Sequence, residues 1–221
     1  MTASDQVLIL PGWLNAGPCH WQSRWQAAHG YVRVDQHDWA RPLRGDWITR
    51  LEDVVTGQNP HLPITLVAHS VGCLLVAAWA ALSRNAHRVT CAFLVAPCDV
   101  TLEALRPALG SWKPITARPA ADPHPPMQPD ALLASTSQES TPHKLPFRSL
   151  LLASHNDPYC SFGQAQAFAT AWGSTLVDCG ACGHSNAESG LGDWPQGHAL
   201  LLALQRGAPC ETRSSRHQES D

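Results

Sequence analysis

Short apolar segments alternate with longer amphipathic segments along the chain. The short segments are rich in Val, Ile and Leu, and they predict buried strands at residues 7–10, 31–35, 64–68, 89–96, 147–153 and 175–178. The longer segments repeat apolar residues at helical spacing and predict helices at residues 17–29, 46–55, 71–82, 161–172 and 198–205, with Asp46 as an N-cap. Strands that alternate with helices are typical of a parallel sheet. We therefore predict an α/β fold of about six mostly parallel strands with helices on both faces, in a single domain over residues 1–206.

Residues 107–146 break this alternation. They contain nine of the chain's 18 prolines and a run rich in Ser and Thr at residues 134–141. Because connections in compact domains usually have about 2–6 residues, we predict a mobile loop or a cover over a site. We expect its part over residues 120–144 to be dispensable for folding. Residues 207–221 are polar and show no periodicity, so we predict a flexible tail there.

The composition provides a hydrophobic core but no charged binding surface. Hydrophobic residues make up 44% of the chain and charged residues 15%. The 15 basic and 18 acidic residues give a net charge of −3 without a basic cluster, so nucleic acid is not an expected partner. No apolar run approaches the roughly 20 residues of a membrane span, and the first residues lack the basic start of a signal peptide. We expect a cytoplasmic protein that does not associate with membranes.

Most of the eight cysteines lie in apolar segments, as Cys73 and Cys91 do. Thiols in such positions behave as small hydrophobic residues in a reducing compartment. Cys179 and Cys182 have the spacing of a metal or redox pair, but no second pair completes a zinc site and no helix start follows them. We expect neither a metal nor a cofactor.

Ser70 lies at the junction of a predicted strand and a predicted helix, in the sequence Ala68-His-Ser-Val-Gly72. A nucleophilic serine on such a sharp turn requires small residues two positions before and after it, so that strand and helix can pass closely. The common pattern is G-x-S-x-G, and Ala68 replaces its first glycine. An ordinary helix N-cap is the alternative interpretation of Ser70.

Two downstream residues supply the partners that a serine nucleophile needs. A histidine must take the hydroxyl proton, and a carboxylate must hold that histidine in the required tautomer. Asp157 and His184 each follow a predicted strand, and they give the chain order serine, acid, histidine. Three other residues remain as alternatives for the acid or the base at this point: Asp99, Asp178 and His155.

The turn at Pro11-Gly12 follows the first predicted strand. Acyl transfer needs two N–H donors for the oxyanion, one from the residue after the nucleophile and one from this first loop. The backbones of Val71 and Trp13 are the candidates. Trp21 and Trp194 lie in segments that meet at the same end of the predicted sheet, so they are candidate substrate-pocket residues, with an ordinary core position as the alternative.

Five segments resemble the small serine hydrolases typified by the bacterial YdeN proteins and by retinoblastoma-binding protein nine: residues 11–25, 68–72, 94–99, 156–161 and 183–195. The resemblance covers nearly the whole chain apart from residues 120–144 and the tail. It implies a compact α/β-hydrolase fold that lacks the first two strands of the larger fold. It also implies a catalytic triad of Ser70, Asp157 and His184. Two departures from the wider superfamily are Ala68 and Pro11, the latter in place of a histidine before the oxyanion glycine.

Together these features predict a serine hydrolase, most simply a carboxylesterase that cleaves small or medium acyl esters through an acyl-enzyme. Its partner would be a small-molecule acyl substrate. Thioesters and amides are alternative substrates, because the same triad hydrolyses them. A non-catalytic module that binds a protein partner on the same fold is the alternative of a different class.

Overall fold

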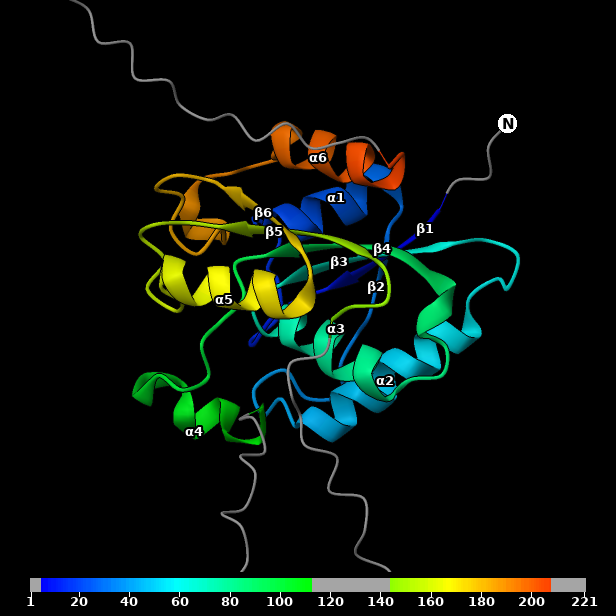
Figure 1. Ribbon diagram of the computed structural model, residues 1–221, viewed down its shortest axis with the longest axis horizontal. Coiled ribbons are helices and arrows are strands. Elements are labelled where there is room, and N and C mark those ends of the chain that lie inside the picture. Colours follow the sequence, from blue (N-terminus) through cyan, green and yellow to red (C-terminus); the bar gives the residue numbers. More distant parts are fainter. Residues whose placement is uncertain (1–4, 113–143, 208–221) are drawn as a thin grey trace, which may run out of the picture.

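The computed structural model describes residues 5–112 and 144–207. These residues fold around one six-stranded sheet in the order β2-β1-β3-β4-β5-β6, and every neighbouring pair of strands is parallel (Figure 1). The strands are β1 (Gln6–Leu10), β2 (Val32–Arg33), β3 (Ile64–His69), β4 (Val89–Val95), β5 (Arg148–Ala153) and β6 (Thr175–Asp178). The sheet confirms the predicted α/β class and the predicted number of strands.

Helices cover both faces of this sheet, as predicted. In Figure 1, α1 and α6 lie above the sheet, whereas α2, α3 and α5 lie below it. The α-helices of the described residues are α1 (Trp21–His29), α2 (Arg44–Gly57), α3 (Val71–Leu82), α4 (Arg106–Leu109), α5 (Phe162–Trp172) and α6 (Pro195–Gln205). Across residues 5–112 and 144–207, no helix has the length and apolar character that crossing a bilayer requires.

The central strands divide the core into two clusters. Along β4, Ala92 and Leu94 belong to the cluster under α2, α3 and α5, whereas Phe93 and Val95 belong to the cluster under α1 and α6. This division follows from the alternation of side chains along a strand. It also explains why β3 and β4 are apolar at nearly every position: both of their faces are buried.

Some element boundaries differ from those predicted. Asp46 does not cap its helix, because α2 begins at Arg44 and Asp46 lies in the first turn, where a carboxylate still favours the helix dipole. Helix α6 begins at Pro195 rather than at residue 198, since proline is well tolerated in the first turn of a helix. Ser161, by contrast, caps α5 and accepts a hydrogen bond from the Gln164 N–H at 3.2 Å.

The start of the proposed proline-rich insertion belongs to the packed fold. Residues 107–112 are helical, and Leu109 and Trp112 are buried in the larger core cluster. The Trp112 indole also donates a hydrogen bond to the carbonyl of Pro42 at 2.6 Å. The loop prediction is therefore wrong for these residues, because their apolar side chains find a core beside α2. The end of the insertion is packed as well, because Leu145 is buried in the same cluster and donates its backbone N–H to the Trp172 carbonyl at 2.9 Å. Residues 113–143 of the insertion and the tail after residue 207 lie outside the described residues.

Candidate active site

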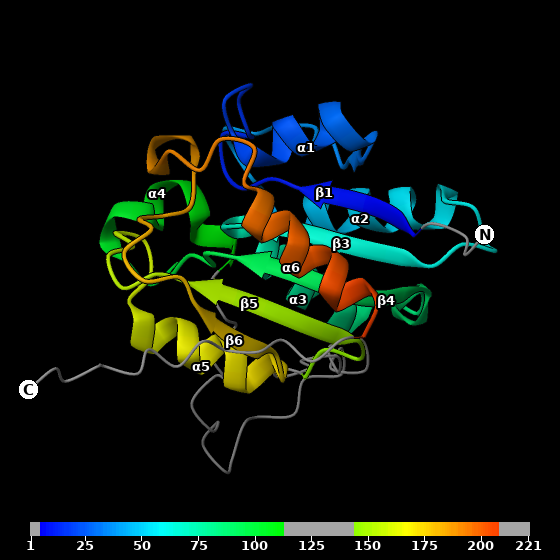
Figure 2. The same ribbon diagram turned by 90° about the horizontal axis from the view of Figure 1, so that it is seen from above.

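The four segments singled out in the sequence meet at one edge of the sheet. The carboxyl ends of the strands all point to the same side, beside the loops that lead into α4 and α6 (Figure 2). Ser70 follows β3, Asp157 follows β5, His184 follows β6, and the Gly12–Trp13 turn follows β1. Clefts at the carboxyl edge are the usual ligand sites of parallel sheets.

Ser70 occupies a strained turn between β3 and α3. Its backbone has φ 55° and ψ −120°, a conformation that non-glycine residues rarely adopt and that exposes the side chain at the top of the turn. Gly72 makes this turn possible, because a Cβ there would collide with the carbonyl oxygen of Leu10. Ala68 is fully buried in the larger core cluster, so its methyl group packs into the interior at the position of the usual glycine.

A continuous line of hydrogen bonds joins Ser70, His184 and Asp157. The Ser70 Oγ lies 2.9 Å from His184 Nε2, and His184 Nδ1 lies 2.9 Å from each carboxylate oxygen of Asp157. The carboxylate can only accept, so Nδ1 carries a proton and Nε2 is left to accept from the serine hydroxyl. The Asp157 side chain is only 3% exposed and that of His184 8%, so water competes little for these bonds.

The residues that remained as alternatives for the acid and the base form hydrogen bonds with other partners than His184. Asp178 accepts from His155 Nε2 at 2.8 Å on the surface, and this hydrogen bond holds the pKa of Asp178 below its usual value. Asp99 accepts from the hydroxyl and the backbone N–H of Thr101 at 2.6 and 2.9 Å. Of the three aspartates, Asp157 is the one that contacts His184.

Two backbone N–H groups near Ser70 are unpaired within the described residues. The N–H groups of Leu14 and Asn15 donate to Trp39 and Gly12, but that of Trp13 has no acceptor. The Val71 N–H is the first of α3, where a helix leaves its donors unsatisfied. Trp13 and Val71 both line the cavity beside Ser70, as the oxyanion prediction requires.

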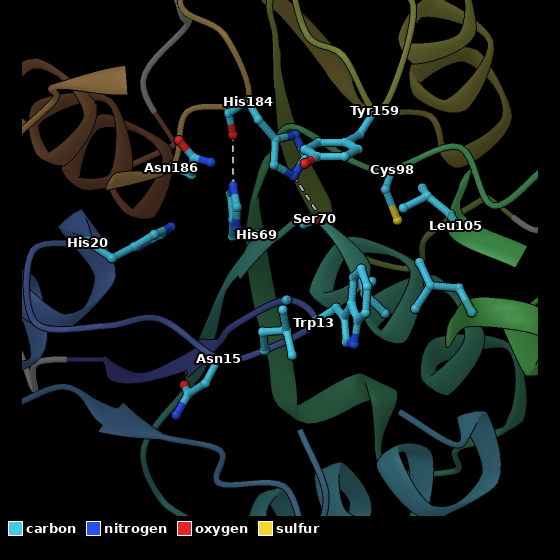
Figure 3. Close-up of a pocket in the computed structure, with 14 residues that line it drawn as sticks. Trp13, Asn15, His20, His69, Ser70, Cys98, Leu105, Tyr159, His184 and Asn186 are labelled. Carbon is cyan, nitrogen blue, oxygen red and sulfur yellow. Dashed lines mark hydrogen bonds between the residues drawn. The ribbon is translucent and has the colours of Figure 1, made fainter. Parts of the chain in front are cut away.

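The cavity beside Ser70 has a volume of about 220 Å³. Figure 3 shows Leu105, Cys98 and Tyr159 on one side of Ser70 and His20, Asn15 and Asn186 on the other. These six residues are not among the site residues predicted from the sequence. They come from separate loops, and only the folded chain brings them together.

Trp21 and Trp194 do not line this cavity, so their assignment to the pocket is corrected. Both are buried in the smaller core cluster, packed edge to face with ring centroids 5.0 Å apart. Trp21 instead supports the loop of the catalytic candidate His184, because its indole N–H donates to the Ser185 carbonyl at 2.8 Å. Trp25 donates in the same way to the carbonyl of Asp193, also at 2.8 Å.

Cys179 and Cys182 form neither a disulfide nor part of a metal-binding group within the described residues. The Cys182 thiol donates to the Cys179 carbonyl, and burial raises the pKa of the Cys179 thiol to about 12. A thiol with such a pKa stays protonated at neutral pH and is a poor metal ligand.

A parallel sheet with helices on both faces and a strained serine turn at its carboxyl edge defines an α/β-hydrolase. The chain belongs to the serine hydrolase family, whose model matches residues 7–203. A YdeN-like hydrolase from Pectobacterium atrosepticum has a similar structure, with a TM-score of 0.69, 25% identity and 92% of each chain covered.

Two further solved structures are similar in fold. The ydeN gene product of Bacillus subtilis has a TM-score of 0.61 at 18% identity, covering 92% of this chain and 100% of that one. The carboxylesterase CesB of Bacillus subtilis has a TM-score of 0.57 at 15% identity, covering 95% of this chain and 86% of that one. A search of the curated proteins gave no significant match. These comparisons confirm the resemblance to YdeN-like proteins and identify the chain as a hydrolase.

Proposed function

We propose that this serine hydrolase is a carboxylesterase that uses Ser70 as nucleophile, His184 as general base and acid, and Asp157 as the group that orients His184. The observation that carries the proposal is the line of 2.9 Å contacts from Ser70 Oγ through the His184 ring to the Asp157 carboxylate. The small cavity beside Ser70 favours small or medium acyl esters as substrates.

The proposed reaction proceeds through an acyl-enzyme. Ser70 Oγ attacks the ester carbonyl carbon while His184 Nε2 takes the hydroxyl proton, and the N–H groups of Trp13 and Val71 bind the oxyanion. The protonated His184 then gives its proton to the leaving alkoxide oxygen as the C–O bond breaks. A water molecule, deprotonated by His184, attacks the acyl-enzyme, which releases the carboxylic acid and restores the Ser70 hydroxyl.

We also propose that the protein works in the cytoplasm, with a small molecule as its partner. The cysteines of the described residues are free thiols, and Cys73, Cys91 and Cys98 are buried among apolar residues. Such thiols suit a reducing compartment.

A fluorophosphonate probe tests the proposal, because it forms a covalent bond with an activated serine hydroxyl and leaves unactivated serines unlabelled. Wild-type protein is expected to be labelled at Ser70 and to hydrolyse p-nitrophenyl acetate. Ser70→Ala should abolish the labelling and reduce hydrolysis by about 10⁴-fold or more, since the members of a triad act as a unit. Ser174→Ala is the control, because this serine precedes β6 at the opposite edge of the sheet and its hydroxyl bonds to the hydroxyl of Ser149.

Two results would redirect the proposal. Folded wild-type protein that the probe does not label would favour a protein-binding module without catalysis. If the probe labels the protein but an acyl thioester or an anilide is cleaved faster than the matched ester, the proposed triad stands. The substrate would then be a thioester or an amide rather than an ester.

A further inference from the structure

The cavity beside Ser70 has two chemically different sides. Leu105 gives one side an apolar lining, together with the Tyr159 ring and the Cys98 thiol, whose pKa burial raises to about 12. The opposite side is formed by Asn186, His20 and Asn15 (Figure 3). A substrate that fills both sides must therefore carry two arms of different polarity.

Asn186 presents only hydrogen-bond donors to this cavity. Its Oδ1 is already occupied, because it accepts from the Glu188 N–H at 3.0 Å and from the Ser189 hydroxyl at 3.4 Å. These bonds cap the short 3-10 helix Ala187–Ser189 and fix the orientation of the amide. The amide nitrogen is directed toward His69 and His184 in Figure 3, and within the described residues it donates no hydrogen bond.

His20 lies at the wall of the same side and carries an N–H that is unpaired in the described part of the chain, on an atom that is buried rather than open to the cavity. Its Nδ1 accepts from the Gln22 N–H at 3.2 Å, so the proton of the neutral ring is on Nε2. The residue is only 5% exposed, and Nε2 has no partner within the described residues. An unpaired buried N–H is unfavourable. The ring lies against His69, with centroids 4.8 Å apart, at the wall of the cavity.

The acceptor of the second amide on this side, that of Asn15, is also occupied. Asn15 Oδ1 accepts from the Ala16 N–H at 2.7 Å and from the Arg33 guanidinium. Arg33 is partly buried and otherwise bonds to the neutral acceptors Gln26, Ala16 and Ser23, so its positive charge lies behind this side without a carboxylate bonded to it. The charge of Arg33 and the Asn186 amide thus both favour an oxygen acceptor on this side, where the Nδ1 of the neutral His69 ring remains as an acceptor of the protein.

We propose that the Asn186 side of the cavity binds an oxygen acceptor carried by one arm of the ester substrate, while the Leu105 side takes a hydrocarbon arm. The substrate class is therefore an ester with an ether, carbonyl or carboxylate oxygen within a few atoms of the scissile bond. This inference rests on the proposed esterase function, and it makes Asn186 a specificity-determining residue.

Two pairs of isosteric substrates test the inference, one for each arm of the ester. The acyl pair is p-nitrophenyl methoxyacetate and p-nitrophenyl butyrate, and the alcohol pair is 2-methoxyethyl butyrate and n-butyl butyrate. Each pair exchanges one methylene for one ether oxygen. The readout is kcat/KM for the ether ester divided by kcat/KM for the hydrocarbon ester of the same pair. This ratio is compared between wild type and variant, so that intrinsic reactivity and general losses of activity cancel.

Asn186→Ser keeps an oxygen that caps the 3-10 helix but removes the amide donor. It should lower the ratio for one of the two pairs by about three- to tenfold, the effect of one neutral hydrogen bond. Asn186→Asp also keeps the cap but replaces the donor with a negatively charged acceptor, so it should lower the same ratio further. Ser189→Ala is the matched control: it weakens the cap without removing the donor, and it should leave the ratio unchanged.

The outcomes separate this inference from the function on which it rests. If ratios for both pairs stay within twofold of wild type in Asn186→Ser and Asn186→Asp while Ser70→Ala is inactive, the esterase stands and the specificity inference is wrong. A ratio that changes equally in Ser189→Ala would overturn the inference too, because loop order rather than the donor would then set the preference. Hydrolysis that persists in Ser70→Ala would overturn the esterase proposal itself.

Discussion

His69 donates a hydrogen bond from its ring Nε2 to the backbone carbonyl of His184, across 2.9 Å. The bond joins the residue before the candidate nucleophile to the candidate base, 115 positions later in the chain. His69 is buried, and burial lowers the pKa of its imidazole well below the usual value, so the ring stays neutral and donates from a single nitrogen. His69 therefore positions the main chain of His184 beside Ser70.

His69→Phe tests this positioning role. It removes the donor and leaves the buried carbonyl of His184 without its partner, which should reduce stability by about 1–3 kcal/mol. We expect kcat to fall about tenfold with little change in KM, because the base loses its alignment while the cavity keeps its shape. His69→Gln can place an amide N–H near the position of Nε2 and should restore most of kcat. Equal losses in kcat for both variants would contradict the role.

Asp157→Asn should reduce ester hydrolysis by about 10⁴-fold, because an amide that replaces the carboxylate favours the wrong tautomer of His184. Asp99→Asn is the comparison, since Asp99 follows a neighbouring strand but bonds to Thr101. It should change the rate less than tenfold. Initial rates with p-nitrophenyl acetate measure both variants, and the reverse ranking would move the acid to the end of β4.

Stability should decrease in acid because of His20. Burial, aided by the charge of Arg33, lowers the pKa of His20 to about 4, whereas the unfolded residue titrates near pH 6.5. Between these values the unfolded chain binds a proton that the folded protein does not, so the free energy of unfolding falls as the pH falls from about 6.5 toward 4. Each pH unit in this range corresponds to about 1.4 kcal/mol.

His20→Asn removes this titration and supplies a side-chain oxygen that can cap α1 in place of the ring Nδ1. Between pH 7 and pH 4.5, the free energy of unfolding should fall less in this variant than in wild type. We expect the two decreases to differ by on the order of 2 kcal/mol, as measured by urea denaturation. His61→Asn changes an exposed histidine and should follow the wild-type curve. A His20→Asn curve that also follows wild type would show that His20 is not buried in its neutral form.

Gly72 should tolerate no side chain. A Cβ at this position would meet the carbonyl oxygens of Leu10 and Pro11, which belong to the backbone and cannot turn away. Gly72→Ala should therefore lose about 2–3 kcal/mol of stability and most esterase activity. Ala68→Gly restores the more common motif and loses only a buried methyl group, so its cost should be about 1 kcal/mol with activity retained. Thermal melts and initial rates distinguish the two, and a stable, active Gly72→Ala would refute the close approach.

The sequence could predict features whose cause is local. Ser70 and His184 each follow an apolar strand, and parallel strands bring their carboxyl ends to one edge, so the order of elements was enough to group the site residues. The choice of Asp157 over Asp178 needed the family resemblance, because both aspartates lie near a histidine in the sequence.

Other features depend on contacts between distant segments and could not be predicted. Trp21 and Trp194 lie in sequence segments that are compatible with either a pocket or a core position. Only the packing of α1 against β4 and α6 shows that both belong to the core. His69 and Asn186 are polar residues with no distinctive spacing. Their roles follow from where the His184 carbonyl and the 3-10 helix at Ala187 come to lie.

The indole bonds from Trp21 to Ser185 and from Trp25 to Asp193 join residues 164 and 168 positions apart. Contacts of such long range form late, because the chain must first lose the entropy of closing large loops. The loop that carries His184 therefore receives its supports only after α1 has docked on the sheet. During refolding, secondary structure should return before hydrolysis does, and a nascent chain should gain activity only when α6 has left the ribosome.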